Sequence, residues 1–146
     1  MCIRDRAAAR AGAMPAGQSG LRESRLHPSE SPRLRIVDGP AWNGYIGLRL
    51  VVTRHSGVAP GAVAYAALVE RVPAGNEGSP IERNLVRAVV GPLGLDELRG
   101  LSKIEHLRAV AVPAGSRADR LASVAWIEAA DGRVMVAAHS PPPECR

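Results

Sequence analysis

The sequence predicts an α+β domain, in which a small mixed or antiparallel sheet is packed by two or three helices. Three observations favour this fold class. A stretch before position 55 alternates between apolar and other side chains, a proline-led helix start lies near position 80, and an Asp-Gly pair near the C-terminus separates two β-rich runs. We therefore expect a β-hairpin at each end of the core, with the helices between the two hairpins.

Two β-type runs predict the N-terminal hairpin. Leu34–Val37 is followed by Asp38-Gly39, a pattern typical of a short strand that enters a turn. In Tyr45–Arg54 every second residue from Ile46 onward is apolar, as in a strand with one buried face. Asn43-Gly44 lies just before this second strand, and we expect the two strands to pair through a longer loop.

Three stretches between the hairpins predict helices. Ala62–Val72 presents apolar residues on one helical face and is ended by Pro73, although its β-branched residues also permit a strand. Ser79-Pro80-Ile81-Glu82 has the composition of a capping box with proline at the first helical position, which predicts a helix over residues 80–90. A further helix is expected over Leu95–Leu107, because two acidic residues open it and an apolar stripe follows.

The C-terminal part returns to β-type patterns. Arg108–Val112 is a short apolar run that predicts a buried strand, and Ser116–Asp119 predicts a short helical turn. Val124–Ala130 and Arg133–His139 flank Asp131-Gly132, which predicts a hairpin with a type I′ turn. This turn places Ala130 opposite Arg133, Glu128 opposite Met135 and Trp126 opposite Ala137.

Composition divides the chain into three parts: a basic leader over residues 1–33, a single domain over 34–139 and a Pro-rich tail over 140–146. Leader and tail lack apolar periodicity, so both are expected to be disordered. Met1–Arg6 resembles the translated end of a transposon adapter used for sequencing libraries, and we exclude it from the predicted fold.

Charge and apolar content set limits on the partners. Residues 1–35 hold seven Arg against three acidic residues, a net +4, so the rest of the chain carries only +1 of the total +5. A basic footprint for nucleic acid is therefore not expected on the folded body. The longest apolar run, Ala62–Val69, is too short to cross a bilayer, so no membrane partner is expected. Cys2 and Cys145 lie at the two ends, which fits a reducing, cytoplasmic compartment.

The residues with catalytic potential are few. The four histidines, His27, His55, His106 and His139, do not have the spacing of a metal site, and no metal is expected. His55 follows a predicted strand, where enzymes often present a catalytic side chain, and Arg54 and His139 are the residues that would complete a site with it. The Gly-x-Ser-x-Gly pattern of a nucleophile elbow is absent from the sequence.

These observations favour a non-catalytic ligand- or protein-binding module, or one part of a longer protein. A protein partner is compatible with them, and they indicate no cofactor, substrate or catalytic residue. Three alternatives stay open at this point: a small enzyme with a site near His55, nucleic-acid binding through the Arg-rich leader, and a non-native reading frame without function.

Overall fold

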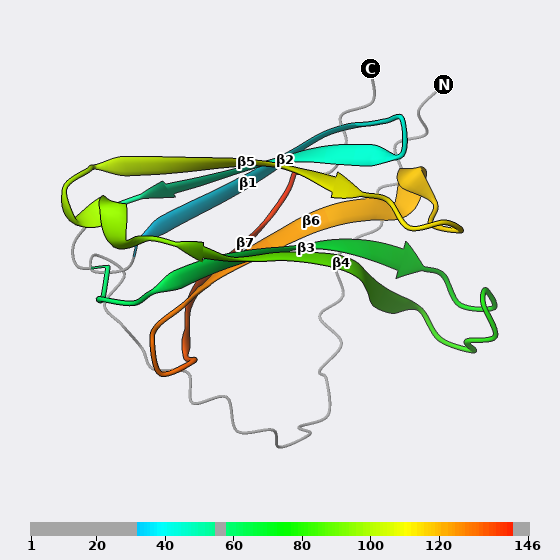
Figure 1. Ribbon diagram of the computed structural model, residues 1–146. Helices are drawn as coiled ribbons and strands as arrows, with labels where there is room; N and C mark the ends of the chain where they lie inside the picture. Colours follow the sequence, from blue (N-terminus) through cyan, green and yellow to red (C-terminus); the bar gives the residue numbers. More distant parts are fainter. Residues whose placement is uncertain (1–31, 55–57, 142–146) are drawn as a thin grey trace.

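The structure is a computed structural model that describes residues 32–54 and 58–141. Within these ranges, seven β-strands form two antiparallel sheets, which lie face to face (Figure 1). The three-stranded sheet has the order β1 (Arg33–Trp42), β2 (Tyr45–Thr53), β5 (Lys103–Ala111). The four-stranded sheet has the order β4 (Arg83–Gly94), β3 (Val63–Val72), β6 (Leu121–Glu128), β7 (Val134–His139).

The α+β prediction is wrong, because this arrangement is a β-sandwich rather than a sheet packed by helices. In the described residues the only helical elements are the short 3-10 turns η1 (Asp96–Arg99) and η2 (Ala118–Arg120). The stretch Ala62–Val72 forms β3, residues 80–90 lie mostly in β4, and Leu95–Leu107 is divided between η1 and β5.

The predicted cap near position 80 shows why the helices failed. The Ser79 hydroxyl donates to the backbone oxygen of Ile81 at 2.8 Å, within a turn, and does not accept from a helical N–H group. The residues that follow are rich in valine and pair along the full length of β3. Strand pairing with an apolar neighbour therefore outweighs the local cap, since β-branched side chains fit a pleated surface better than a helix.

Two glycine-containing turns fix the hairpins. Asn43 and Gly44 have φ of 49° and 78°, the positive pair that a two-residue type I′ turn requires. This turn joins β1 to β2 directly, so the predicted longer loop is wrong and Asp38-Gly39 lies within β1.

The Asp131-Gly132 hairpin is confirmed, but its turn differs from the prediction. Only Gly132 has a positive φ, and its N–H donates to the carbonyl of Ala129 at 2.9 Å. This is a three-residue loop that ends in a left-handed glycine, which shifts the register next to it. Glu128 consequently pairs with Val134 rather than Met135, whereas the predicted pair Trp126–Ala137 is present. The strand predicted over Arg108–Val112 forms most of the second half of β5, and η2 overlaps the predicted helical turn.

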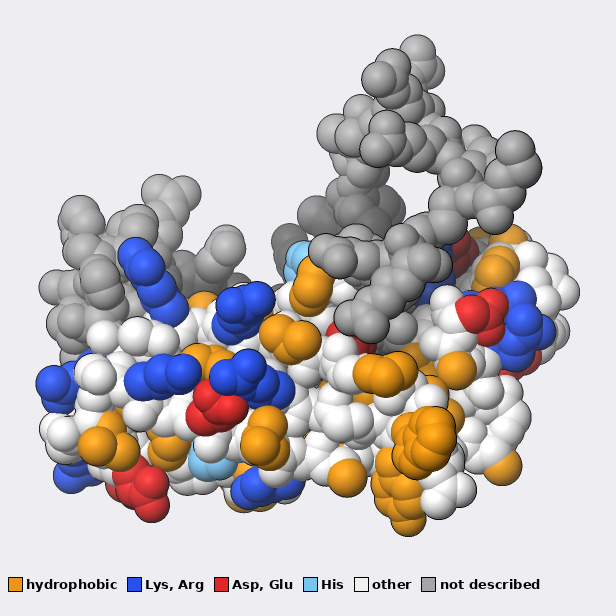
Figure 2. Space-filling view, turned by 90° about the horizontal axis from the view of Figure 1, so that it is seen from above, with side chains coloured by type: hydrophobic (Ala, Val, Ile, Leu, Met, Phe, Trp, Pro, Cys, Tyr) orange, Lys and Arg blue, Asp and Glu red, His pale blue; other side chains and the backbone are white. Residues whose placement is uncertain are grey.

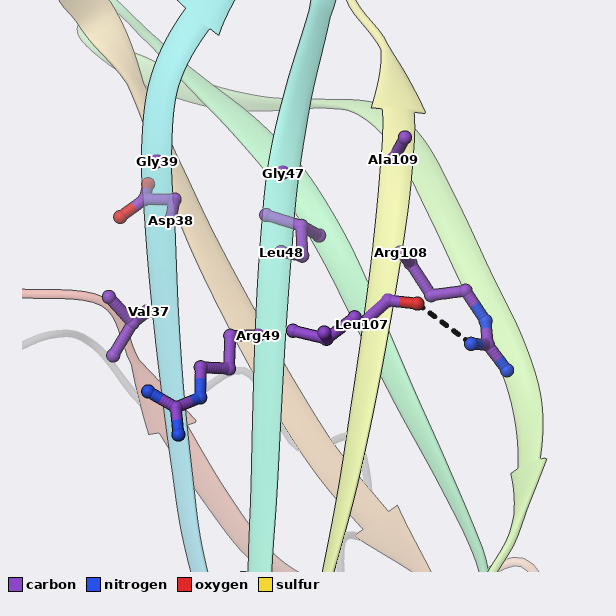
Figure 3. A pocket seen from close by; sticks show the side chains of 9 residues that line it. All are labelled: Val37, Asp38, Gly39, Gly47, Leu48, Arg49, Leu107, Arg108 and Ala109. Atoms are coloured by element: carbon purple, nitrogen blue, oxygen red, sulfur yellow. Dashed lines mark hydrogen bonds between the residues drawn. The ribbon is translucent and has the colours of Figure 1, made fainter.

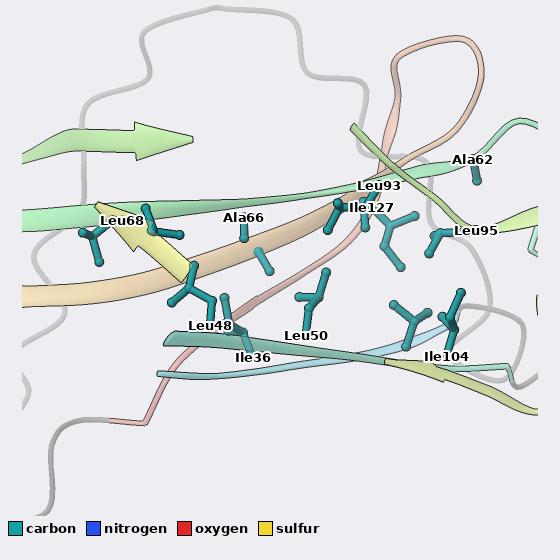
Figure 4. Close-up of a cluster of buried hydrophobic side chains, with 14 of the residues drawn as sticks. Ile36, Leu48, Leu50, Ala62, Ala66, Leu68, Leu93, Leu95, Ile104 and Ile127 are labelled. Atoms are coloured by element: carbon teal, nitrogen blue, oxygen red, sulfur yellow. The ribbon is translucent and has the colours of Figure 1, made fainter. Parts of the chain in front are cut away.

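The core is built from unequal contributions of the two sheets (Figure 4). The three-stranded sheet supplies large aliphatic side chains, and the four-stranded sheet supplies small alanines together with Leu68, Leu93, Leu121 and Ile127. Large side chains from one layer therefore fill the space that small ones leave on the other, which a core without phenylalanine requires. The large residues are Ile36, Ile46, Leu48, Leu50, Val52 and Ile104, and the small ones are Ala62, Ala64, Ala66 and Ala125.

The loops gather at the two ends of the sandwich (Figure 1). At one end the Val112 N–H donates to the carbonyl of Gly44 at 2.8 Å, which brings the β5–β6 connection against the β1–β2 turn. At the other end the Arg54 N–H donates to the carbonyl of Ser102 at 2.9 Å, which ties the β2–β3 connection to the β4–β5 connection. The β6–β7 turn lies at this second end.

Candidate functional site

The sequence-derived enzyme site is not assembled by the described residues. His55 lies outside them. Arg54 directly follows β2 and donates from Nη1 to the carbonyl of Arg99 at 3.0 Å. His139 is the last residue of β7 and pairs with Val124 of β6, and its Nδ1 lies 3.0 Å from the backbone oxygen of Ser140. Arg54 follows a strand of the three-stranded sheet and His139 lies in the four-stranded sheet, and no hydrogen bond among the described residues joins them.

A serine and aspartate cluster lies beside His139. The hydroxyls of Ser123 and Ser140 each donate to Oδ2 of Asp38 at 3.2 Å, and both serines are buried. In a catalytic triad the histidine stands between the hydroxyl and the carboxylate, whereas here the carboxylate binds both hydroxyls directly. Because Asp38 comes from β1 and the serines come from the other sheet or just after it, the cluster is a tie between the sheets.

The most buried charge in the described residues is Glu70, whose side chain is fully excluded from solvent. Arg87 Nε donates to its Oε2 at 2.7 Å, and the Arg117 N–H donates to its Oε1 at 3.1 Å. Arg87 also donates to Glu77 at 3.2 Å, and hydrogen bonding to Glu70 raises the pKa of its guanidinium. Both carboxylate oxygens are thus occupied, and the group joins β3, β4 and the β5–β6 loop instead of facing a ligand.

The half-buried imidazole of His106 lies on β5, and its Nε2 is shielded from solvent without a hydrogen-bond partner among the described residues. Burial lowers the pKa of this imidazole, and the positive charge of Arg108 adds to the effect. The charge of Glu97 and the backbone of Gly94 act in the opposite direction.

This environment predicts a pH-dependent stability. The unfolded chain has the higher His106 pKa and binds the extra proton, so the stability present at neutral pH declines as the pH falls through about 6.5. In His106→Gln we expect the urea midpoint to fall less between about pH 7.5 and pH 5.5 than it does in the wild type. Equal declines in the two proteins would contradict a desolvated imidazole at this position.

The outer face of the four-stranded sheet carries an extended apolar surface. From Val63 to Val69 its strand β3 is apolar on both sides, and the partners that flank it on the outer side are also mostly apolar. Val86 and Val89, on the edge strand β4, keep 63% and 58% of their surface exposed. The apolar residues of this face are Tyr65, Ala67, Val69, Val86, Val89, Val124, Trp126, Val134 and Ala137. We call this set the apolar face.

An aromatic pair lies in the middle of the apolar face. The rings of Tyr65 and Trp126 stack with centroids 5.4 Å apart, and Trp126 Nε1 donates to Glu128 at 2.7 Å. The neighbouring strand gives the tyrosine ring room through Gly91. A Cβ on Gly91 would lie 2.6 Å from Tyr65 Cδ1 and 2.9 Å from the backbone oxygen of Ala64.

Gly91→Ala is accordingly expected to lower the free energy of unfolding by about 1–3 kcal/mol, as other overpacked sites do. Gly91 has φ of 132°, which adds backbone strain for any other residue. Urea denaturation measures the loss, and near-UV circular dichroism reports displacement of the stacked rings. Gly47→Ala is the matched control, because a Cβ there meets nothing within 4 Å. Equal stability of the two variants would contradict the close approach at Gly91.

The outer face of the three-stranded sheet is more basic than the apolar face. Figure 2 looks down on this face and shows basic side chains gathered over one half of it. A shallow hollow of about 500 Å³ lies on it, over Gly39, Gly47 and Ala109 (Figure 3). Arg49 and Leu107 stand at one border of these small residues. A smaller hollow of about 170 Å³, at the end of the sandwich, is lined by Arg54, Val58, Leu98 and Arg99.

The sequence analysis missed both outer faces as candidate sites. The signal for the apolar face was present, since the run Ala62–Val69 is apolar at every position and not only at alternate ones. The basic half of the outer face of the three-stranded sheet could not be seen from the net charge of the body, which is close to zero. Side chains alternate along each strand, so residues of one charge can gather on one face of a sheet even when the total is balanced.

Further properties of the described residues bear on function. No three His, Cys, Asp or Glu side chains in 32–54 and 58–141 gather in a group that would hold a metal ion. Within the same ranges, no helix has the length and apolar character needed to cross a membrane. Comparisons with protein-family models, curated proteins and solved structures gave no match to this chain.

Proposed function

We propose that the protein is a non-catalytic protein-binding module whose partner covers the apolar face. The observation that carries this proposal is the exposure of Val86 and Val89 beside the stacked pair of Tyr65 and Trp126. A strand that is apolar on both sides, such as β3, is typical of a sheet that is covered on both sides. The core covers only one side of this sheet.

The composition of the apolar face fits a protein partner. Interface cores are poor in charge and rich in aromatic residues, and contiguous exposed apolar surface marks interaction sites in folded proteins. At its borders Arg71 forms an ion pair with Glu82 at 2.8 Å, and Glu128 accepts a hydrogen bond from Trp126. A partner that covers the face would therefore meet Arg71 with its charge already paired.

The polar clusters support a non-catalytic role. Asp38 and Glu70 each accept two hydrogen bonds from groups of the protein itself. The Asp38 cluster joins the two sheets, the Glu70 group joins β3 and β4 to the β5–β6 loop, and neither provides the nucleophile–base contact that catalysis requires.

A second copy of the chain is the simplest partner, since a surface with balanced charge can pair with itself about a two-fold axis. The experiment is sedimentation velocity of the full chain over a wide concentration range. We expect the wild type to self-associate and the double variant Val86→Asp/Val89→Asp to remain monomeric. Ile81→Asp is the matched control, because Ile81 is 68% exposed but lies in the β3–β4 connection.

A different protein as partner would leave the wild type monomeric while the apolar face stays accessible. The dye ANS binds exposed apolar surface, so its fluorescence with the wild type should then exceed that with the double variant. A monomeric wild type that binds ANS no better than the double variant would contradict the proposed function. Circular dichroism of each variant checks that the fold is retained.

A further inference from the structure

An exposed aromatic pair marks one end of the outer face of the three-stranded sheet. Trp42 and Tyr45 lie opposite each other across the Asn43-Gly44 turn, and 82% and 52% of their surfaces are exposed. Side chains alternate along a strand, so Tyr45 shares its face with Gly47 and Arg49. Large aromatic side chains at such exposure have no role in the core, and they offer flat surfaces for stacking.

The floor next to this pair is flat. Gly39, Gly47 and Ala109 come from three neighbouring strands and carry at most one methyl group (Figure 3). A Cβ built on Gly47 would meet nothing within 4 Å, so the space above the floor is open. The hollow has room for a flat group lying against the backbone.

Basic residues occupy the same face beyond Arg49. The register places Arg33 beside Thr53, Arg35 beside Val51 and Lys103 on the other side of Thr53. The basic residues of this face are Arg33, Arg35, Arg49 and Lys103. Their alternation with apolar inward residues places all four outward.

One acidic residue lies among these four. Glu105 accepts from Arg49 at 2.6 Å and 3.0 Å and lies 3.4 Å from Lys103, and hydrogen bonding to Arg49 lowers the pKa of its carboxyl. Arg33 and Arg35 have no ion-pair partner among the described residues. The strands of this face therefore carry a net charge of about +3, in a body whose total charge is nearly neutral.

We propose that this face binds single-stranded nucleic acid, with a base stacked on Trp42 and Tyr45 and the phosphates directed toward Arg35 and the basic residues beside it. A stacking platform combined with a positively charged track is the arrangement that proteins use to bind single strands without sequence preference. From Tyr45 to Arg49 the strand rises roughly 13 Å, enough to separate a stacked base from phosphates further along the same strand. The site lies on the opposite sheet from the apolar face, so it is independent of the proposed protein interface.

The experiment measures binding of the full chain to a fluorescein-labelled oligothymidine of about ten nucleotides, by fluorescence anisotropy at several salt concentrations. Trp42→Ala should weaken binding about 5- to 100-fold, as loss of one stacking side chain does. Arg35→Ala should reduce the slope of log K against log salt by about 0.7, the value for one phosphate contact on a single strand. Gly47→Leu should abolish binding by filling the floor while leaving the charge unchanged.

Matched controls separate this site from general attraction to a basic chain. Arg133→Ala removes one positive charge at the β6–β7 turn, and Ile81→Ala removes an exposed apolar side chain in a loop; both should bind like the wild type. The Arg-rich leader is present in every variant, so differences between variants report on the face alone.

Three outcomes would overturn the proposal. The first is absence of binding by the wild type at low salt. The second is equal weakening by Arg35→Ala and Arg133→Ala with no effect of Trp42→Ala, which would assign the binding to overall charge. The third is tighter binding of heparin, with the oligothymidine displaced and Trp42→Ala without effect, which would identify an acidic polysaccharide as the ligand. Circular dichroism melting of each variant confirms that the sandwich is folded.

Discussion

Glu70→Ala is expected to lower the free energy of unfolding by roughly 3 kcal/mol, the lower part of the range for a broken buried ion pair. The substitution removes the acceptor for Arg87 and for the Arg117 N–H in a place without solvent. Arg87 retains Glu77 as a partner, which keeps the loss from being larger. Urea denaturation at neutral pH measures the change.

Glu82→Ala is the control for this prediction. Glu82 forms a comparable pair with Arg71 at 2.8 Å, but both side chains are at least half exposed, so the expected loss is only about 0–1 kcal/mol. Similar decreases in the free energy of unfolding for the two variants would show that burial does not determine how much the Glu70–Arg87 pair stabilises the fold.

Leu68→Ala is expected to cost about 3–5 kcal/mol, toward the upper end for removal of a buried leucine. Leu68 is completely buried, and its partners on the neighbouring strands are Ala88 and Ser123, both small. Small neighbours cannot move far enough to fill the space, so a cavity remains. The loss in the free energy of unfolding then approaches the sum of two contributions, the lost burial of the leucine atoms and the unfavourable energy of the cavity.

The midpoint of urea denaturation again provides the measurement, and Leu101→Ala is the matched control. Leu101 is 50% exposed in the β4–β5 connection, so the same chemical change there should alter stability by no more than about 0.5 kcal/mol. A loss at Leu68 below about 1.5 kcal/mol would indicate that the core repacks around the missing side chain.

The hairpins could be predicted from the sequence because their signals are local. A glycine that adopts positive φ after Asn43 or Asp131 determines where the chain reverses, whatever the rest of the molecule does. The turn types were less certain, because a type I′ turn and a three-residue loop both accept an Asp-Gly pair and differ only in where the strands close.

The middle of the fold could not be predicted, because its signals depend on distant partners. Ala62–Val72 satisfies a helical stripe and a strand equally well when nearly every position is apolar. Its pairing with β4 and β6 on either side decides in favour of the strand. The mistaken helix at position 80 has the same origin, since Ser79 and Pro80 can stand in a turn before a strand as readily as at a helix start once a partner strand is present.

The candidate sites could not be predicted from the sequence for a related reason. Trp42 and Arg35 are seven positions apart, and a shift of register between Asp38 and Ala41 places both on one face. Without that irregularity in β1, simple alternation would place the two side chains on opposite faces. The residues themselves were visible in the sequence, whereas their common orientation required the structure.

The tie that Asp38 makes to Ser123 and Ser140 has a consequence for synthesis of the protein on the ribosome. It connects the first strand of the sandwich to a residue just beyond the last one, across 102 positions of sequence. A nascent chain that has emerged only as far as β6 holds this carboxylate without one of its two hydroxyl donors and lacks the edge strand that covers it. Stable folding must therefore wait until nearly all of the domain has left the exit tunnel, which is the slow, late assembly expected of a topology dominated by distant pairings.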